Sequence, residues 1–571
     1  MKRIIVIVAA LSILAAGTAR GAGSPVEERT VSLPMSDGVA LEASLFLPGG
    51  TGRFPAVLVR TPYGRQQHVT EARFWAAHGY AVVVQDTRGK WGSGGEYVPF
   101  LNEHADGMAT LDWITAQPWS DGNVGMYGSS YLAFCQLVLA STGHPALKSI
   151  MPISGWISDD GQINRGGAHH IMLSIPWILH EESQTKRSID DVELDDLFEY
   201  LPLIDAFDSI GLESKIWNEE FDFSHLEAYC ASNIGIPALH ITGWNDFVHN
   251  AALSVYSQAA RGRAGSCQKL MVGPWFHDQF YTTYTEVGDE DFGPQSALGL
   301  ERLMELALDW FDATVRNDRA DLSAWPEVDL FVMGADEWRE YERWPPAAVY
   351  DRKLFLGSAS GANSSNGDGY LSDFPAVDGG YDSYVFDPNN PVPTFGGANF
   401  HFMLHLIGVK DQRDIEKRND VLVYTTDPLA DDMEIIGPVE AVLYASTGGR
   451  DTDFTAKLVE VRPNGYARII EEGIIRASYR NGPDKRELLG PGRVYRLTVD
   501  MGTTAIVVPR GHRIRLEVSS SNFPKYDRNP NTGEEALEAR TLVPVEQKVY
   551  FGGDRRSHLL LPVVEKQLTR F

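Results

Sequence analysis

The chain has 571 residues, too many for a single hydrophobic core, so two or three domains are expected. With 43% hydrophobic and 11% aromatic residues, its composition is that of a globular protein and excludes disorder as the main state. The net charge is -27 and no stripe of Lys or Arg stands out. Such a chain repels phosphate backbones, which makes nucleic acid a poor partner.

The N-terminus predicts a secretory signal peptide, residues 1–19. Two basic residues precede an apolar run, Ile4 to Ala16, that is too short to span a bilayer comfortably, and small residues follow it. Cleavage is expected after Ala19 or as late as Gly21. The alternatives are a membrane anchor or a buried strand. The signal peptide predicts an exported protein, periplasmic or secreted, with no membrane contact after cleavage.

Strand and helix patterns alternate between residues 30 and 272. Residues 30–47 alternate apolar and polar side chains around a turn, which predicts a hairpin. Short, continuous apolar runs predict strands buried on both faces at 56–59, 81–84, 150–153, 238–241 and 269–272. Helical patterns lie between them, for example at 105–116 and 131–139. This alternation indicates a mostly parallel α/β sheet.

Two later regions differ from this pattern. Residues 158–231 are rich in helix formers and predict an inserted helical cap. Their carboxylates are expected to form a solvated helix face: Glu181, Glu182, Asp190, Asp191, Glu193, Asp195 and Asp196. From about residue 350, short alternating strands separated by Gly, Asn and Pro predict an antiparallel β-sandwich or jelly roll.

The three cysteines are too few for a disulfide scaffold, and their spacings do not match a zinc site. One bridge is possible, with Cys230 and Cys267 the more plausible pair. Cys135 falls in a predicted helix and is expected to be buried. The chain carries no motif for a metal or an organic cofactor, and no pattern predicts its oligomeric state.

Residues 123–134 combine a β-rich run, a Gly-Ser-Ser corner and an apolar helical run. Strand, tight corner and helix form the context of a nucleophile elbow, which requires a small residue two positions before the nucleophile. Gly128 meets this requirement for Ser130, whereas Tyr127 would occupy that position for Ser129. We therefore predict Ser130 as the nucleophile. The alternative is an ordinary polar turn, because the G-x-S-x-G pattern is incomplete here.

A serine nucleophile needs a base and a group that orients this base. Two later segments supply them in the order Ser, Asp, His, and each follows a predicted strand: Gly243 to Asp246 and Gly273 to His277. Taken alone, Asp246 could be a turn aspartate and His277 a loop histidine. Their order and matching contexts favour a catalytic triad with Ser130, because catalytic groups collect at the carboxyl ends of parallel strands.

An oxyanion hole is also expected. The loop after the predicted strand at 56–59 contains Tyr63, whose hydroxyl could donate to an oxyanion. In α/β-hydrolases, the corresponding loop supplies one oxyanion donor. The other donor would be the backbone N–H of Tyr131, the residue after the nucleophile.

These segments resemble the cocaine-esterase-like serine hydrolases, a family that includes X-Pro dipeptidyl peptidases, α-amino-acid ester hydrolases and some acylases. The resemblance covers nearly the whole mature chain. The segments that carry it are Arg60-Thr-Pro-Tyr63, Gln85-Asp-Thr-Arg-Gly89, Gly92-Ser-Gly-Gly-Glu96, Asp121-Gly-Asn-Val-Gly-Met126, Ile241-Thr-Gly-Trp244, Gly273-Pro-Trp275, Asp387-Pro with Pro391-Val-Pro, Asp420-Val-Leu and Asp451-Thr-Asp-Phe454.

The resemblance implies an α/β-hydrolase domain with an inserted helical cap and a C-terminal jelly roll. We expect the hydrolase domain at 24–157 and 232–348, the cap at 158–231 and the jelly roll at 349–571. The same triad and the same two oxyanion donors follow from it. The family elbow reads G-x-S-Y-x-G, and here Ala133 replaces the last Gly. Asp86 and Arg88 lie in a family motif, where we expect a buried structural ion pair and no catalytic role.

The residues after Asp246 bear on the substrate. Amino-acid ester hydrolases of this family carry extra carboxylates there that hold an α-ammonium, whereas here Phe247 and Val248 follow. With Trp156 and Trp244, they suggest an apolar acyl pocket, although each of these residue types more often belongs to a core than to a pocket. Residues 400–406 of the jelly roll are also expected to face the site.

The sequence predicts an exported serine hydrolase that cleaves a small ester or amide through an acyl-enzyme, of carboxylesterase or acylase type. One alternative is an X-Pro dipeptidyl peptidase, which would bind a free N-terminal amine of a short peptide. An alternative from another class is a secreted binding protein with a decayed active site.

Overall fold

The structure is a computed structural model and describes residues 26–157, 163–183, 192–212, 214, 217, 230–262, 267–316, 322–400 and 405–565. The predicted signal peptide and the middle of the predicted cap, with Asp190 and Asp191, lie outside these residues. Within the described ranges, no helix has the length and apolar character needed to cross a membrane.

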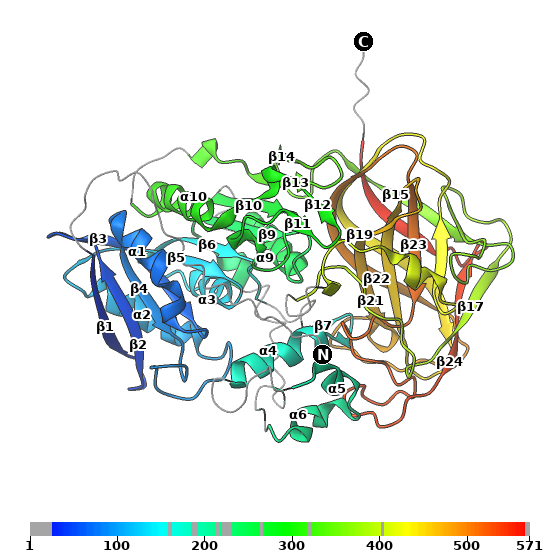
Figure 1. Cartoon of the computed structure of the whole chain (residues 1–571), viewed down its shortest axis with the longest axis horizontal. Helices are drawn as coiled ribbons and strands as arrows, with labels where there is room; N and C mark the ends of the chain where they lie inside the picture. Colours follow the sequence, from blue (N-terminus) through cyan, green and yellow to red (C-terminus); the bar gives the residue numbers. More distant parts are fainter. Residues whose placement is uncertain are drawn as a thin grey trace, which may run out of the picture.

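The N-terminal half forms one ten-stranded sheet (Figure 1). Its central strands pair in parallel, and antiparallel pairs lie at both edges. Both faces of the central strands are buried, as their continuous apolar sequences predicted. In spatial order the strands are β1 (Glu27–Pro34), β2 (Ala40–Leu47), β4 (Ala81–Asp86), β3 (Phe54–Thr61), β5 (Ser120–Ser129), β6 (Leu147–Ile153), β9 (Ala238–Gly243), β10 (Gln268–Gly273), β13 (Val328–Val332) and β14 (Glu337–Tyr341).

Five helices pack on this sheet, with α2 against α3 and α1 against α10. They are α1 (Val69–Ala77), α2 (Glu103–Thr115), α3 (Tyr131–Ala140), α9 (His249–Arg261) and α10 (Gly299–Thr314). The predicted α/β-hydrolase architecture is confirmed. The parallel strands β3, β5, β6, β9 and β10 direct their carboxyl ends to one edge of the sheet, where the loops that follow them meet.

A small, mainly helical region is inserted between β6 and β9 and lies below the junction of the two halves in Figure 1. Its own core is built from α4 and the short helices that follow it. The elements described there are β7 (Asn164–Arg165), β8 (Ala168–His169), α4 (Ile171–Ser183), α5 (Leu194–Glu199) and α6 (Ala206–Ser209).

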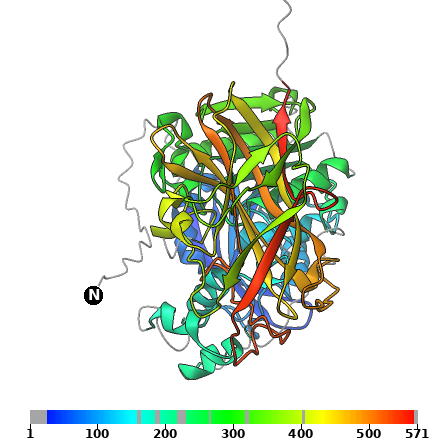
Figure 2. The ribbon, with the colours of Figure 1, turned by 90° about the vertical axis from the view of Figure 1, so that its right-hand side faces the viewer.

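The C-terminal half is all-β, as predicted, with eleven strands in one continuous, mostly antiparallel pairing network (Figures 1 and 2). The strands are β15 (Val349–Gly357), β16 (Tyr370–Ser372), β17 (Gly380–Phe386), β18 (Leu422–Thr425), β19 (Met433–Thr447), β20 (Asp453–Val461), β21 (Ala467–Arg476), β22 (Tyr495–Val508), β23 (Arg513–Ser519), β24 (Val545–Phe551) and β25 (His558–Val564).

One hydrophobic core joins the two halves. Leu330 and Val332 of β13 belong to the same buried cluster as Ile435 of β19 and Ile506 of β22. Backbone pairing also crosses the junction, because Met333 forms a parallel bridge with Ile506. The all-β domain is therefore packed directly against the edge of the hydrolase sheet, where it can contribute to a site on the hydrolase domain.

Candidate active site

Ser130 occupies the sharp turn between β5 and α3. Its backbone has φ 57° and ψ -119°, a conformation that residues other than glycine rarely adopt. Its amide donates to the Ile153 carbonyl at 2.9 Å, which ties the turn to β6. Gly128 has φ 138°, and a Cβ there would lie 2.7 Å from Leu132. A small residue is therefore required two positions before Ser130, as predicted.

The two adjacent serines differ in their contacts. Ser129 is buried, and its Oγ accepts a hydrogen bond from the Tyr281 hydroxyl at 3.2 Å. A longer contact of 3.5 Å joins Ser129 Oγ to the Asp278 carboxylate. Ser130 is half-buried and lies at the turn itself. The Ser129 hydroxyl is thus held by Tyr281, whereas Ser130 is the serine at the tip of the turn.

Asp246 and His277 form a buried pair in the loops that follow β9 and β10. His277 Nδ1 lies 2.9 Å and 3.0 Å from the two carboxylate oxygens of Asp246. Because a carboxylate only accepts, Nδ1 carries the proton and Nε2 is left to act as a base. Asn245 holds the two loops together, with its amide on the Trp275 carbonyl and its side chain on the Pro274 carbonyl.

Two further donors orient Asp246. The Ser154 hydroxyl donates to Oδ2 at 2.5 Å, and the Val248 amide donates to Oδ1 at 3.1 Å. Burial alone would raise the pKa of Asp246, but His277 and these hydrogen bonds outweigh it and hold that pKa below its ordinary value. Asp246 is therefore an ionised acceptor. The sequence analysis missed Ser154; its only signal was its position directly after a predicted strand.

Asp278 adds a second carboxylate next to His277. Burial alone would lower the pKa of the imidazole, but Asp246 and Asp278 together raise it to about 9. The contact between Ser129 and Asp278 joins the residue before Ser130 to the residue after His277. The histidine loop consequently lies against the nucleophile elbow, and the structure brings the three predicted triad residues to one place.

Tyr63 and Tyr131 lie on the side of the cap. Tyr63 follows β3, and its hydroxyl accepts a long hydrogen bond, 3.5 Å, from Trp177 Nε1 of α4. Burial, and next the nearby Glu181 carboxylate, raise the pKa of the Tyr63 hydroxyl, which therefore stays protonated and able to donate. The Tyr131 amide is the first of α3 and has no acceptor within its helix. Both groups can therefore donate to a developing oxyanion.

Aromatic rings from three regions surround these groups. Phe100 stacks on Tyr131 with ring centroids 4.6 Å apart, and it contacts Trp156 at 5.0 Å and Trp177 at 5.8 Å. Phe247 packs on the His277 ring at 4.7 Å. We call Phe100, Trp156, Trp177, Phe247 and Phe400 the aromatic wall. The sequence analysis did not single out Phe100 and Trp177, which lie in a loop and in the cap.

Phe400 belongs to the all-β domain and contacts the site directly. Its ring centroid lies 5.1 Å from that of Phe247 and 5.8 Å from that of His277. The expectation that residues 400–406 face the site therefore holds for Phe400, whereas residues 401–404 lie outside the described ranges. Val248 is fully buried, and it acts on the site through the hydrogen bond that its backbone amide donates to Asp246.

Trp244 is not part of this wall. Its indole belongs to the core shared by the two domains, where Nε1 donates to the Phe331 carbonyl at 2.7 Å and the ring faces Trp344. The prediction of Trp244 as a pocket residue is therefore wrong. The side chain extends from the end of β9 to β13.

Asp86 and Arg88 are structural, but they are not paired with each other. Asp86 is fully buried and forms an ion pair with Arg65. Arg88 binds Asp106 at 2.6 Å and Asp37 at 2.8 Å. The expected single ion pair is therefore replaced by three, one formed by Asp86 and two by Arg88, that fix the loop after β4.

Two other predictions are corrected. Glu181 is buried and pairs with Lys90 at 2.7 Å, whereas Glu193, Asp195 and Asp196 are exposed as predicted. Glu181 therefore does not belong to the predicted solvated face. It can be buried because Lys90, from the loop after β4, neutralises its charge.

The expected disulfide between Cys230 and Cys267 is absent from the described residues, and both remain thiols. Cys230 is buried in the hydrolase core, where Ser141 contacts its sulfur. Cys135 is fully buried in α3, as predicted.

The comparisons with known proteins agree with this arrangement. Residues 37–279 match a family model described as X-Pro dipeptidyl-peptidase (S15 family), and residues 322–560 match one described as the X-Pro dipeptidyl-peptidase C-terminal non-catalytic domain. The chain is 34% identical to the cocaine esterase of Rhodococcus sp. strain MB1 Bresler over 574 residues, 94% of this chain and 98% of the relative. The chain belongs to the cocaine-esterase-like family of serine hydrolases.

Other relatives of this family span its esterase and peptidase members. A putative Xaa-Pro dipeptidyl-peptidase of Bacillus cereus is 23% identical, with 83% of this chain and 76% of that protein covered. A solved α-amino acid ester hydrolase superposes with a TM-score of 0.80 at 25% identity, covering 97% of this chain and 99% of its own. The chain is therefore a serine hydrolase with an α/β-hydrolase domain and a C-terminal all-β domain.

Proposed function

We propose that this serine hydrolase cleaves small esters or amides with an apolar acyl group, using Ser130, His277 and Asp246. The observation that carries the proposal is the buried Asp246–His277 pair, at 2.9 Å, in a loop that contacts the strained Ser130 elbow. A histidine that donates to a carboxylate through Nδ1 has Nε2 available as a general base. These are the groups that activate a serine nucleophile.

The reaction follows from these roles. His277 Nε2 takes the Ser130 proton while Oγ attacks the acyl carbon, and Asp246 stabilises the imidazolium that forms. The Tyr63 hydroxyl and the Tyr131 amide donate to the oxyanion. His277 then protonates the leaving alcohol or amine as its bond to the acyl carbon breaks, which leaves an acyl-enzyme. Water attacks this ester by the same route, with its proton passing to His277 and back to Ser130.

The aromatic wall supports an apolar, bulky acyl group. One part of the wall lies next to the two oxyanion donors: Phe100 stacks on Tyr131 and contacts Trp156, and Trp177 binds the Tyr63 hydroxyl. The other part, Phe247 and Phe400, lies against His277. Such rings favour an aromatic or branched acyl group through apolar burial and edge-to-face contacts. The residues that follow Asp246 offer no carboxylate for an α-ammonium.

An X-Pro dipeptidyl peptidase is the second candidate, favoured by the description of the family model that matches residues 37–279. The two are separated by comparing kcat/KM for p-nitrophenyl benzoate, p-nitrophenyl acetate and Ala-Pro-p-nitroanilide. We expect the benzoate ester to be preferred, with the acetate as the internal control for an acyl group too small to reach the wall. Preference for Ala-Pro-p-nitroanilide would replace the esterase proposal with the peptidase.

We also propose that the protein is exported. The basic start and the apolar run Ile4 to Ala16 support this location. The N-terminal residue of the purified mature protein tests it, because cleavage after Ala19 or Gly21 leaves Arg20 or Ala22 first. A chain that retains the apolar run would contradict export by signal cleavage.

A further inference from the structure

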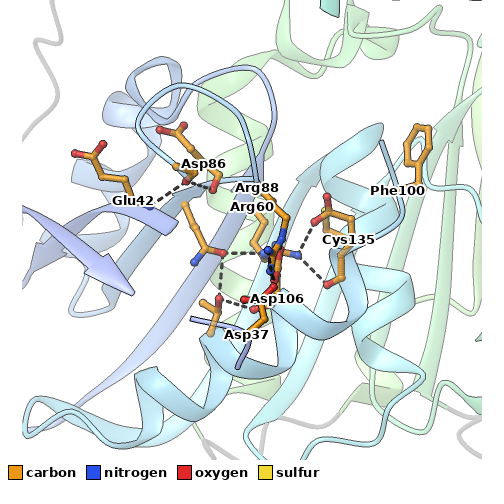
Figure 3. A network of polar contacts seen from close by, with 12 residues as sticks. Asp37, Glu42, Arg60, Asp86, Arg88, Phe100, Asp106 and Cys135 are labelled. Carbon is orange, nitrogen blue, oxygen red and sulfur yellow. Dashed lines mark hydrogen bonds and ion pairs between the residues drawn. The ribbon is translucent and has the colours of Figure 1, made fainter. Parts of the chain in front are cut away.

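A buried ion pair lies beneath the nucleophile elbow, outside the triad. Arg60 of β3 and Glu103 of α2 are 1% and 3% exposed. Arg60 Nη1 lies 2.6 Å from Glu103 Oε2 and donates to the Glu103 carbonyl at 2.9 Å (Figure 3). Burial works against the guanidinium charge, but Glu103 outweighs it and keeps the pKa of Arg60 above its ordinary value. The Arg60 guanidinium therefore stays charged, and we call the Arg60–Glu103 ion pair the anchor.

This anchor reaches the oxyanion donor at the elbow. The Tyr131 hydroxyl donates to Glu103 Oε1 at 2.8 Å and accepts from the Phe100 amide, also at 2.8 Å. Burial, and next Glu103, raise the pKa of Tyr131 well above its ordinary value, so the hydroxyl stays protonated. Tyr131 is therefore held at its side-chain end by Glu103, and its other end is the amide that faces the oxyanion.

The same anchor also fixes the strand that leads to the second donor, Tyr63. Arg60 lies three residues before Tyr63 in the segment that ends β3, and its Nε donates to Gln85 Oε1 of the neighbouring strand β4 at 2.8 Å. Figure 3 shows Arg60 within this network of polar contacts. Tyr63 follows the end of β3. Through Arg60, this end of the strand is therefore bound to Glu103, which also binds the Tyr131 hydroxyl.

Phe100 shows that this network supports a strained geometry. Its φ is 68°, a value that residues other than glycine rarely adopt, and its amide is held by the Tyr131 hydroxyl. Its ring forms part of the aromatic wall and stacks on the Tyr131 ring. One hydroxyl thus fixes both the elbow residue and the loop that completes the wall.

We propose that Glu103, with Arg60, is a positioning residue that sets the geometry of the oxyanion hole through the Tyr131 hydroxyl. The proposal rests on the catalytic roles proposed for Ser130, Tyr63 and the Tyr131 amide. Oxyanion donors act only when they are held in place before the reaction, and a supporting contact that loosens them lowers the rate of the chemical step. The expected consequence of losing the support is a lower kcat with little change in KM.

Tyr131→Phe is the most direct test, because it removes one hydroxyl and leaves the amide, the ring and the ion pair intact. The measurements are kcat and KM for a p-nitrophenyl ester, per site labelled by a fluorophosphonate, and the inhibition constant of a boronic acid. The boron adduct of the serine places an oxygen in the oxyanion hole. We expect kcat to fall about tenfold, a part of the roughly 10²–10³-fold cost of losing a whole donor. KM should change less than twofold, and the boronic acid should weaken by the same factor as kcat.

Glu103→Gln is the second variant, because it keeps the size of the side chain and removes its charge. The matched control is Asp453→Asn in the all-β domain, where an equally buried carboxylate, 1% exposed, binds Arg476 at 2.9 Å and 3.0 Å. The control should lower thermal stability and leave kcat per labelled site unchanged. If Glu103→Gln does not fold, Tyr131→Phe still decides.

A Tyr131→Phe enzyme with unchanged kcat and boronic acid affinity, and only a lower melting temperature, would overturn the positioning role. Failure of the catalytic assignment itself gives a different result. In that case the wild-type enzyme carries no fluorophosphonate label on Ser130, whatever the variants do.

Discussion

At the scale of single residues, the site depends on backbone strain that its neighbours hold in place. Ser130 has φ 57°, and such a conformation costs on the order of 1–3 kcal/mol in a residue other than glycine. The hydrogen bond from its amide to Ile153 holds the turn in this conformation, and Gly128 avoids the clash that a side chain there would make with Leu132. The sequence could predict this turn, because the requirement for Gly128 is local.

The second carboxylate beside His277 leads to a prediction on pH. The base must be neutral to accept the Ser130 proton, and Asp246 and Asp278 raise the pKa of its imidazole to about 9. Activity should therefore rise with pH up to about that value. Asp278→Asn removes one raising charge, lowers the imidazole pKa and moves this limb of the kcat/KM profile to lower pH, by roughly one unit.

The control for this experiment is Asp121→Asn, an exposed carboxylate at the opposite end of β5. Its pH profile should overlay that of the wild type. An Asp278→Asn profile that also overlays the wild type would mean that Asp278 does not act on His277.

At the scale of elements, helix α4 connects the cap to the catalytic loops. Trp177 of α4 donates to the Tyr63 hydroxyl, and its ring lies nearly parallel to that of Phe100 with centroids 5.8 Å apart. One turn further on, the Glu181 carboxylate pairs with Lys90 of the loop after β4, and Lys90 also donates to the Glu181 carbonyl at 3.1 Å. The pair is 6% and 0% exposed, so water does not screen it.

Lys90→Met should therefore loosen α4. Breaking one side of a buried pair leaves Glu181 uncompensated and costs about 3–5 kcal/mol. We expect faster limited proteolysis within the cap and a lower kcat/KM, because Trp177 loses its fixed position. Lys417→Met, which removes an exposed pair with Asp414, is the control and should change neither. Unchanged proteolysis and kcat/KM in Lys90→Met would show that the pair does not hold the cap.

Prediction from the sequence succeeded for elements with a local signal. The apolar runs at 56–59 and 81–84 lie in strands β3 and β4, and two residues of the proposed triad, Asp246 and His277, lie in the loops after β9 and β10. It failed for Glu181, whose neighbours in the sequence are typical of a solvated helix face. The lysine that neutralises it lies 91 residues earlier in the chain, so the periodicity of the helix sequence cannot reveal the pair.

At the scale of the whole molecule, the site is assembled from three regions of the chain. The hydrolase domain supplies the proposed triad, the cap supplies Trp177, and the all-β domain supplies Phe400. The shared core between β13 and the all-β domain fixes Phe400 against His277 and also buries Trp244. The sequence could not distinguish these two aromatic residues, because only the packing between domains decides which one faces the site.

The central claim is that Ser130 is the nucleophile, and labelling with a fluorophosphonate tests it most directly. The account predicts that the wild type is labelled on Ser130, that Ser130→Ala is neither labelled nor active on an activated ester, and that Ser129→Ala keeps its label. Ser129 is the matched control, one residue away and held by Tyr281 in a structural bond. A folded Ser130→Ala enzyme that retained the label and near-normal turnover would contradict the account.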